Sequence, residues 1–251
     1  MKRCIFVGPS LHGVTDRPSE IEFLPPAAQG DLARAAVGGT RWIGLIDGYF
    51  GTCASVWHKE ILYALSIGCH VWGASSMGAL RAAECRLFGM RPVGEIAWQF
   101  ALGELEDDAE VALVHGPSEA DYAPFTEALV DARPTIEAVL AAGEIDLTEA
   151  HDLIVAARSL HFTERTVEAI LKLVAHSPGR RQELELLYEA HRIRAKQIDA
   201  IRLVGEMCAE PPERVQEGEW RPAASASMDK LMREVGPRPD FCSSGAHWLT
   251  I

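Results

Sequence analysis

Two adjacent serines, Ser75 and Ser76, stand where a buried strand is expected to give way to a helix. The segment 70–84 combines an apolar run, a turn of small residues and a helical pattern. A tight turn of this kind raises a hydroxyl above the edge of a sheet, beside the free N–H groups of the first helical turn. The position therefore predicts either a nucleophilic serine or a serine that caps the helix.

The spacing of small residues favours Ser76 over Ser75 as the nucleophile. A turn of the type G-x-S-x-G needs small residues two positions before and two positions after the serine. Ala74 and Gly78 occupy these positions around Ser76, whereas Met77 breaks the pattern around Ser75. The N–H of Met77 would then face an oxyanion, aided by the helix dipole. Taken alone, the pattern still favours a helix cap, because similar turns are common.

Four titratable or charged side chains could assist the serine. His58 or Lys59, in an expected helix over 56–67, could act as general base, and Lys59 could equally hold an anionic substrate. Asp47, at the end of an expected strand, could orient a histidine as the acid of a catalytic triad does. Arg81, one turn into the helix that follows the serines, could clamp an anion. For each of them the alternative is structural: a polar helix surface, a turn cap or a surface ion pair.

The loop 8–13, which contains Ser10, follows the first expected strand. It lacks the spacing of a phosphate-binding loop, and no dinucleotide-binding fingerprint is present. The acidic run 104–110 lacks the ligand spacing of a calcium loop, and the six cysteines contain no C-x-x-C pair. The sequence therefore predicts neither a metal nor a cofactor, and it leaves Ser10 and Ser75 as candidates for substrate contact.

Alternating strand and helix signals over the first 120 or so residues predict an α/β fold with a mostly parallel sheet and helices on both faces. Residues that follow the strands of such a sheet meet along one edge, which is where sites form. This placement would bring Ser10, Asp47, the two serines and the segment His115-Gly116 together. The expected strands are 4–8, 41–47, 69–73 and 111–115.

After residue 124 the strand signals vanish and helical periodicity takes over. The sequence predicts an α/β core over 1–123, a helical region over 124–210 and an irregular tail over 211–251. The expected helices of the second part are 125–142, 147–158, 163–176 and one long helix from 180 to about 207.

Composition and charge exclude several classes of partner. The chain of 251 residues carries a formal net charge of −12, which argues against nucleic acid or an anionic membrane as the main partner. No apolar run approaches the length of a membrane span, and the apolar start at 4–8 is too short for a signal peptide. The protein is expected to be cytoplasmic, and homo-oligomer formation stays open.

Seven segments together resemble the TfuA-like family, in the family's order over roughly residues 4–140. They include the loop after the first strand, the segment around Asp47, the helix with His58 and Lys59, and the serine turn with Arg81. Several of these motifs are long, so the resemblance is specific. The segments are 8–11, 25–31, 46–50, 56–62, 73–84, 88–90 and 104–113.

The resemblance implies a partner of YcaO-type ATP-dependent enzymes, which convert a backbone amide to a thioamide in ribosomally made peptide natural products. The activity it implies is hydrolysis of the C-terminal thiocarboxylate of a small ubiquitin-like sulfur-carrier protein, which releases sulfide beside the YcaO enzyme. Ser76 would attack, His58 or Lys59 would accept its proton, and Lys59 and Arg81 would neutralise the substrate. Attack by water, with Ser76 donating a hydrogen bond, stays open.

Two other functions fit the same residues. A non-catalytic adaptor would dock on the YcaO enzyme and recruit the sulfur donor, with Ser76 as a helix cap and His58 as a structural residue. A hydrolase of unrelated small esters or amides would turn over substrates that carry no carrier protein.

Overall fold

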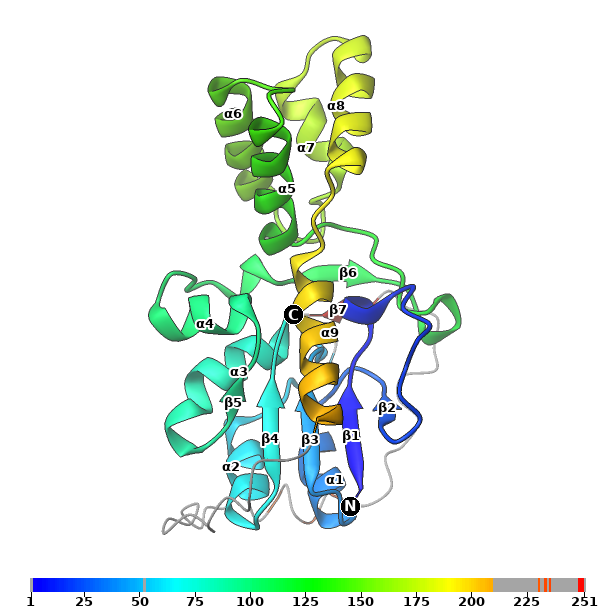
Figure 1. Ribbon diagram of the computed structural model, residues 1–251, viewed down its shortest axis with the longest axis vertical. Helices are drawn as coiled ribbons and strands as arrows, with labels where there is room; N and C mark the ends of the chain where they lie inside the picture. The colour runs from blue at the N-terminus through cyan, green and yellow to red at the C-terminus, as the bar shows by residue number, and fades with distance from the viewer. Residues whose placement is uncertain are drawn as a thin grey trace.

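The computed structural model describes residues 2–51, 53–209, 230, 233, 235 and 248–250, and it consists of an α/β core below a helical lobe (Figure 1). The core is built on a five-stranded sheet of parallel strands in the order β2-β1-β3-β4-β5. The predicted fold class is confirmed. The strands are β1 (Arg3–Phe6), β2 (Glu22–Leu24), β3 (Trp42–Leu45), β4 (His70–Gly73) and β5 (Arg91–Pro92).

Both edge strands escape the sequence analysis because they are short: β2 has three residues, and β5 has two, one of which is a proline. The expected strand over 111–115 is wrong in its placement. β6 (Leu113–His115) lies outside the parallel sheet and pairs antiparallel with β7 (Trp248–Thr250). The rest of the predicted tail, including Cys242, falls outside the described residues apart from 230, 233 and 235.

Helices cover both faces of the sheet, because successive strand residues point to opposite sides. Ile43, Leu45 and Val71 pack on one face with the apolar residues of α1 to α4. Trp42 and Trp72 point to the other face, where α9 lies across the strands (Figure 1). The helices of the core are α1 (Asp31–Val37), α2 (His58–Ser66), α3 (Met77–Cys85), α4 (Glu95–Leu102) and α9 (Ala195–Cys208), with short 3-10 helices at Pro9–Leu11, Arg86–Phe88, Asp108–Glu110 and Ser118–Ala120.

The helical lobe has an apolar core of its own, formed by α5 (Leu129–Ala141), α6 (Leu147–Ser159), α7 (Val167–Val174) and α8 (Pro178–Ala190). The expected single helix from 180 to about 207 is wrong, because residues 191–194 interrupt it. There the N–H of Ile193 donates to the Thr135 hydroxyl, and Arg192 forms an ion pair with Glu127. The chain thus leaves the lobe after α8, and α9 packs on the sheet.

Glycines set the distance between the serine turn and the strands beside it. A Cβ on Gly78, in the first turn of α3, would lie 1.8 Å from the carbonyl oxygen of Leu45 in β3. A Cβ on Gly73, the last residue of β4, would lie 2.1 Å from the carbonyl oxygen of Gly78. The turn that contains Ser75 and Ser76 therefore rests on backbone contacts that only glycine permits.

Replacing Gly78 by alanine should destabilise the protein by roughly 3 kcal/mol or more, because backbone of two elements must move to make room. Chemical denaturation measures this free energy of unfolding. Gly205→Ala is the matched control: Gly205 lies within α9, where an added Cβ meets nothing within 4 Å. That substitution should stabilise the protein by about 0.5–1 kcal/mol. Equal effects of the two substitutions would contradict the packing described.

Candidate functional site

Asp47 ties together the ends of the two central strands β1 and β3. Its carboxylate is wholly buried and accepts hydrogen bonds from the N–H groups of Gly8 (2.8 Å) and Ser10 (3.0 Å) and from the Ser10 hydroxyl (2.8 Å). In a sheet of order 2-1-3-4-5, the crevice beyond β1 and β3 is the switch point where ligands bind. Asp47 and Ser10 therefore lie where ligands usually bind in a sheet of this topology.

Ser75 extends this network to a third strand. Its hydroxyl donates to the Ser10 hydroxyl at 2.8 Å, so the chain of hydrogen bonds runs from Ser75 through Ser10 to Asp47. The backbone of Ser75 is left-handed, with a φ of 67°, and the N–H of Ser76 donates to the carbonyl of Ala74 (2.7 Å) across it. A non-glycine residue in such a tight turn is strained, and strain of this kind gathers at functional sites.

The geometry separates the roles of the two serines in a way that the spacing rule does not. Ser75, not Ser76, stands in the strained conformation expected of a nucleophile between strand and helix. Both serines are wholly buried, but the Ser76 hydroxyl has no hydrogen-bond partner among the described residues. It precedes α3, yet its side chain makes no capping hydrogen bond. The glycine that clears the turn is Gly78, three residues after Ser75, because its Cα lies against β3.

His115, at the end of β6, is a buried residue that the sequence places at this edge without assigning it a chemical role. Its Nδ1 lies 2.6 Å from the carbonyl oxygen of Gly116, and its Nε2 has no partner among the described residues. Burial lowers the pKa of this imidazole, although the charge of Asp47 partly opposes the effect. A neutral imidazole with Nδ1–H bound to a carbonyl leaves the Nε2 lone pair free to accept a proton. The position of His115 at the end of an expected strand is the sequence feature that points to this edge of the core.

Lys196, near the start of α9, is a residue that the sequence analysis missed. Its side chain is almost wholly buried, and its ammonium donates to the carbonyl of Val111 at 2.7 Å. Burial lowers the pKa of Lys196, while the charges of Asp47 and Asp131 act in the opposite direction. Nothing local in the sequence marks this residue, because its neighbours come from distant segments.

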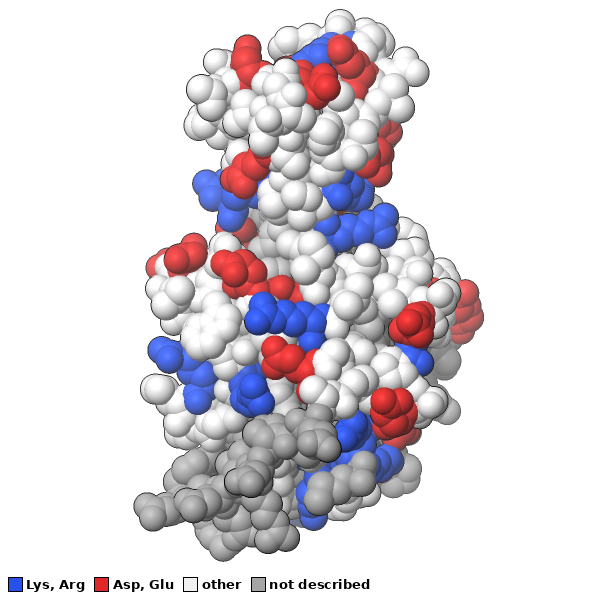
Figure 2. Space-filling model, viewed as in Figure 1, with Lys and Arg blue, Asp and Glu red and all other residues white. Residues whose placement is uncertain are grey.

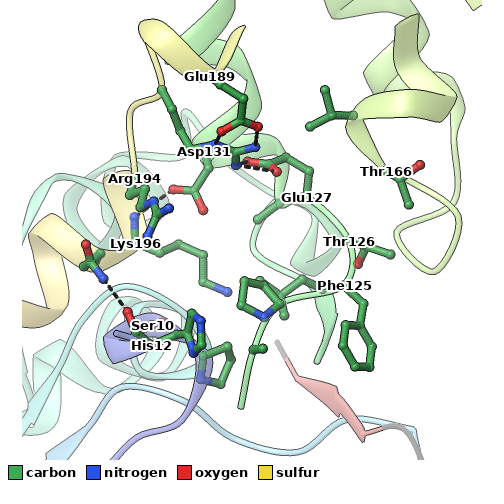
Figure 3. Close-up of a pocket in the computed structure, with 18 residues that line it drawn as sticks. Ser10, His12, Phe125, Thr126, Glu127, Asp131, Thr166, Glu189, Arg194 and Lys196 are labelled. Carbon is green, nitrogen blue, oxygen red and sulfur yellow. Dashed lines mark hydrogen bonds and ion pairs between the residues drawn. The ribbon is translucent and has the colours of Figure 1, made fainter. Parts of the chain in front are cut away.

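A cavity of about 360 Å³ lies between the core and the helical lobe, beside this network (Figure 3). Ser10 and His12 line it from the loop after β1, and Lys196 extends into it from α9. Phe125 and Asp131 line it from the segment that enters the lobe. The cavity thus gives the Ser75–Ser10–Asp47 chain a neighbouring space that is large enough for a ligand.

Three of the predicted site residues gather elsewhere, on the surface of α2 and α3. His58 Nε2 lies 2.6 Å from a carboxylate oxygen of Glu84, which also accepts from Arg81 at 2.8 Å. Lys59 is exposed in the same helix as His58. Because the Ser76 hydroxyl has no partner among the described residues, neither His58 nor Lys59 is placed to take its proton here.

Arg81 and Met77 line a second cavity, of about 510 Å³, together with Asp107 and Asp108. Met77 is the first residue of α3, so its N–H has no acceptor within the helix, as a role toward an oxyanion requires. Among the described residues, no group of three His, Cys, Asp or Glu side chains converges in a way that could hold a metal ion.

Glu60, in the same motif as His58 and Lys59, has a structural role. Its buried carboxylate accepts hydrogen bonds from the N–H groups of Gly30, Leu32 and Ala33 at the start of α1, and from Trp57 at the start of its own helix. Burial raises the pKa of Glu60 to about 7, although these N–H donors lower it in part. The motif therefore joins α2 to α1.

Glu60 should make the stability of the protein depend on pH. The pKa of Glu60 is higher in the folded state (about 7) than the ordinary value of 4.5, so its contribution is full below pH 4.5 and is lost as the pH rises through 7. The free energy of unfolding should fall by about 3 kcal/mol across this range. Denaturation at several pH values should show a flatter dependence for Glu60→Gln. The exposed-residue control Glu185→Gln should keep the wild-type slope, and an unchanged slope in Glu60→Gln would contradict this prediction.

Comparison with known protein families supports the motif resemblance. The family model described as TfuA-like protein matches residues 47–166, which run from the Asp47 segment through the serine turn into the helical lobe. A search of curated proteins returned no match. None of the helices in the described part of the chain has the length and apolar character needed to cross a membrane. Residues 47–166 of the chain therefore match the TfuA-like family, in agreement with the resemblance of its sequence motifs.

Proposed function

We propose that this protein hydrolyses the C-terminal thiocarboxylate of a small ubiquitin-like sulfur-carrier protein and releases sulfide for a YcaO-type enzyme that forms backbone thioamides. The match of residues 47–166 to the TfuA-like family supports the association with a YcaO partner. The observation that carries the hydrolase proposal is the strained Ser75, whose hydroxyl is hydrogen-bonded through Ser10 to the buried carboxylate of Asp47. Asp121 and Tyr122 are also left-handed, so the strain at Ser75 supports a catalytic role only in combination with its hydrogen bonds to Ser10 and, through it, to Asp47.

In the proposed first step, Ser75 Oγ attacks the thiocarboxylate carbon. The proton of Ser75 passes to Ser10, and the proton of Ser10 passes to Asp47, along hydrogen bonds of 2.8 Å each. The carbon–sulfur bond breaks, the sulfur takes the proton held by Asp47 and leaves as hydrosulfide, and the carrier remains as an ester on Ser75; the proton that His115 accepts in the second step completes hydrogen sulfide. The N–H of Met77, at the positive end of α3, is the donor nearest in sequence that can stabilise the oxyanion.

In the proposed second step, water cleaves the ester and restores Ser75. His115 accepts the proton of this water, because its Nε2 lone pair has no other partner among the described residues and burial keeps the imidazole neutral. The sum of the two steps consumes one water and converts the thiocarboxylate to a carboxylate and hydrogen sulfide. This scheme replaces Ser76 by Ser75 and His58 by His115 in the mechanism that the sequence predicts.

Replacing Ser75 by glycine should abolish sulfide release, with a loss of more than about a thousandfold, while making the protein more stable. Glycine lacks the hydroxyl and also relieves the left-handed strain at this position, which is worth about 1–2 kcal/mol. The assay incubates the purified protein with thiocarboxylated carrier, without the YcaO enzyme or ATP, and follows sulfide and the mass of the carrier. Ser75→Ala should be equally inactive but less stable than Ser75→Gly.

Matched variants separate this mechanism from the alternatives. His58→Ala should keep most of the activity, because its imidazole is paired with Glu84 on the surface. Activity that survives in Ser75→Gly and is lost in Ser76→Ala would transfer the role to Ser76. No sulfide release by the wild-type protein would support the adaptor function instead. Rapid turnover of small esters without a carrier would indicate an unrelated hydrolase.

A further inference from the structure

The Lys196 ammonium is the buried charge that the contacts of the protein leave least satisfied. The residue is 2% exposed, and the only hydrogen bond that its Nζ makes among the described residues goes to the carbonyl of Val111. An ammonium group has three protons to donate, and lysine is almost never buried without a paired charge. The ion pairs within the described residues do not include Lys196. A negatively charged ligand that reached this ammonium would therefore supply the ion pair that it lacks among the described residues.

The carboxylates around Lys196 are already occupied by other donors. Asp47 accepts three hydrogen bonds from the loop after β1. Glu127 forms an ion pair with Arg192 at 2.8 Å, and Asp131 accepts the backbone N–H of Lys196 itself at 2.9 Å. Burial raises the pKa of Asp131, which disfavours its charged form, although the charge of Lys196 acts in the opposite direction. The negative charges nearby therefore do not replace an ion pair for Lys196.

The cavity between the core and the helical lobe gives an anion access to the Lys196 ammonium. Figure 3 shows the Lys196 side chain extending from α9 away from Asp131 and towards the Ser10–His12 loop. Arg194 also lines this cavity and adds positive charge, whereas Arg192, which lines it too, is paired with Glu127 and Glu189. Figure 2 shows basic side chains on both sides of the junction between lobe and core, although acidic ones are interspersed over the rest of this face. The entrance is therefore compatible with a negatively charged ligand.

The size and lining of the cavity indicate more than a lone inorganic anion. Its volume of about 360 Å³ falls in the range of about 300–1000 Å³ that is usual for ligand pockets. Pro9, Pro124 and Phe125 supply apolar wall beside the charged groups. A peptide tail with a negatively charged end fits this combination of polar groups, apolar wall and a buried cation.

We propose that Lys196 anchors the terminal carboxylate or thiocarboxylate of an extended polypeptide tail that enters the cavity between the core and the helical lobe. This inference rests on the proposed function for the nature of the tail. It assigns to Lys196 a positioning role: it holds the charged terminus beside the Ser75–Ser10–Asp47 chain.

The anchor makes binding depend on pH in a defined direction. Burial lowers the pKa of Lys196, so the ammonium is lost at a lower pH than in an ordinary lysine. Binding should be strong below that pKa and should weaken as the pH rises through it, and bound anion should raise the pKa. The titratable and charged groups that surround Lys196 and contribute to the profile are His12, Asp47, His115, Glu127, Asp131, Arg192 and Arg194.

The test uses acetyl-triglycine with a free C-terminal carboxylate as the probe and its C-terminal amide as the control. NMR of the Lys196 side chain, assigned with Lys196→Gln, follows its titration in the wild-type protein. We expect the carboxylate probe to raise the pKa of Lys196 by about one unit, which is a tenfold preference for the charged form. We also expect it to bind at least tenfold more tightly than the amide. An unchanged pKa, or equal affinity for both probes, would overturn the proposal.

Variants distinguish this inference from the proposed function. Lys196→Gln should remove the preference for carboxylate over amide and should raise KM for thiocarboxylated carrier more than it lowers kcat, and Lys196→Arg should restore part of both. Sulfide release with an unchanged KM in Lys196→Gln would refute the anchor while the hydrolase proposal stands. Conversely, tight carboxylate binding by a wild-type protein that releases no sulfide would refute only the hydrolase proposal.

Discussion

The buried carboxylate of Asp47 is the constraint on which the site depends. It holds the N–H groups of Gly8 and Ser10, so it fixes the loop after β1 against the end of β3. Ser10 is thereby oriented to accept the hydroxyl proton of Ser75 from the turn after β4. Three strand ends are coupled through one acceptor, and removing its charge would release two backbone donors and one hydroxyl at once.

The α/β class and the meeting of Ser10, Asp47 and Ser75 at one sheet edge could be predicted from the sequence, because buried parallel strands carry continuous apolar runs and their ends share an edge. Which of the two serines is strained could not be predicted from the sequence. It depends on the Cα of Gly78 lying against the Leu45 carbonyl, a contact between two elements that a local spacing rule does not contain. The surface pairing of His58 with Glu84 depends in the same way on how α2 packs against α3.

The position of Lys196 and the role of His115 could not be predicted, for a related reason. Lys196 reaches the site because the chain leaves the lobe at residues 191–194 and α9 returns to the sheet, whereas helical periodicity alone predicts a continuous helix. His115 belongs to a strand that pairs outside the main sheet, so its burial depends on neighbours such as Tyr49 and Tyr122. In both cases tertiary contacts override a local pattern.

The return of α9 to the core also makes the helical lobe an insertion within the α/β unit rather than an appendage at its end. The face of the sheet that carries Ile5, Trp42 and Trp72 is covered by Ala200, Leu203 and Met207, which follow the whole lobe in the chain. During synthesis this face stays uncovered until the ribosome has passed residue 207. A fragment cut at residue 123, where the sequence places the end of the core, would display two buried tryptophans to water and should be recovered as aggregate.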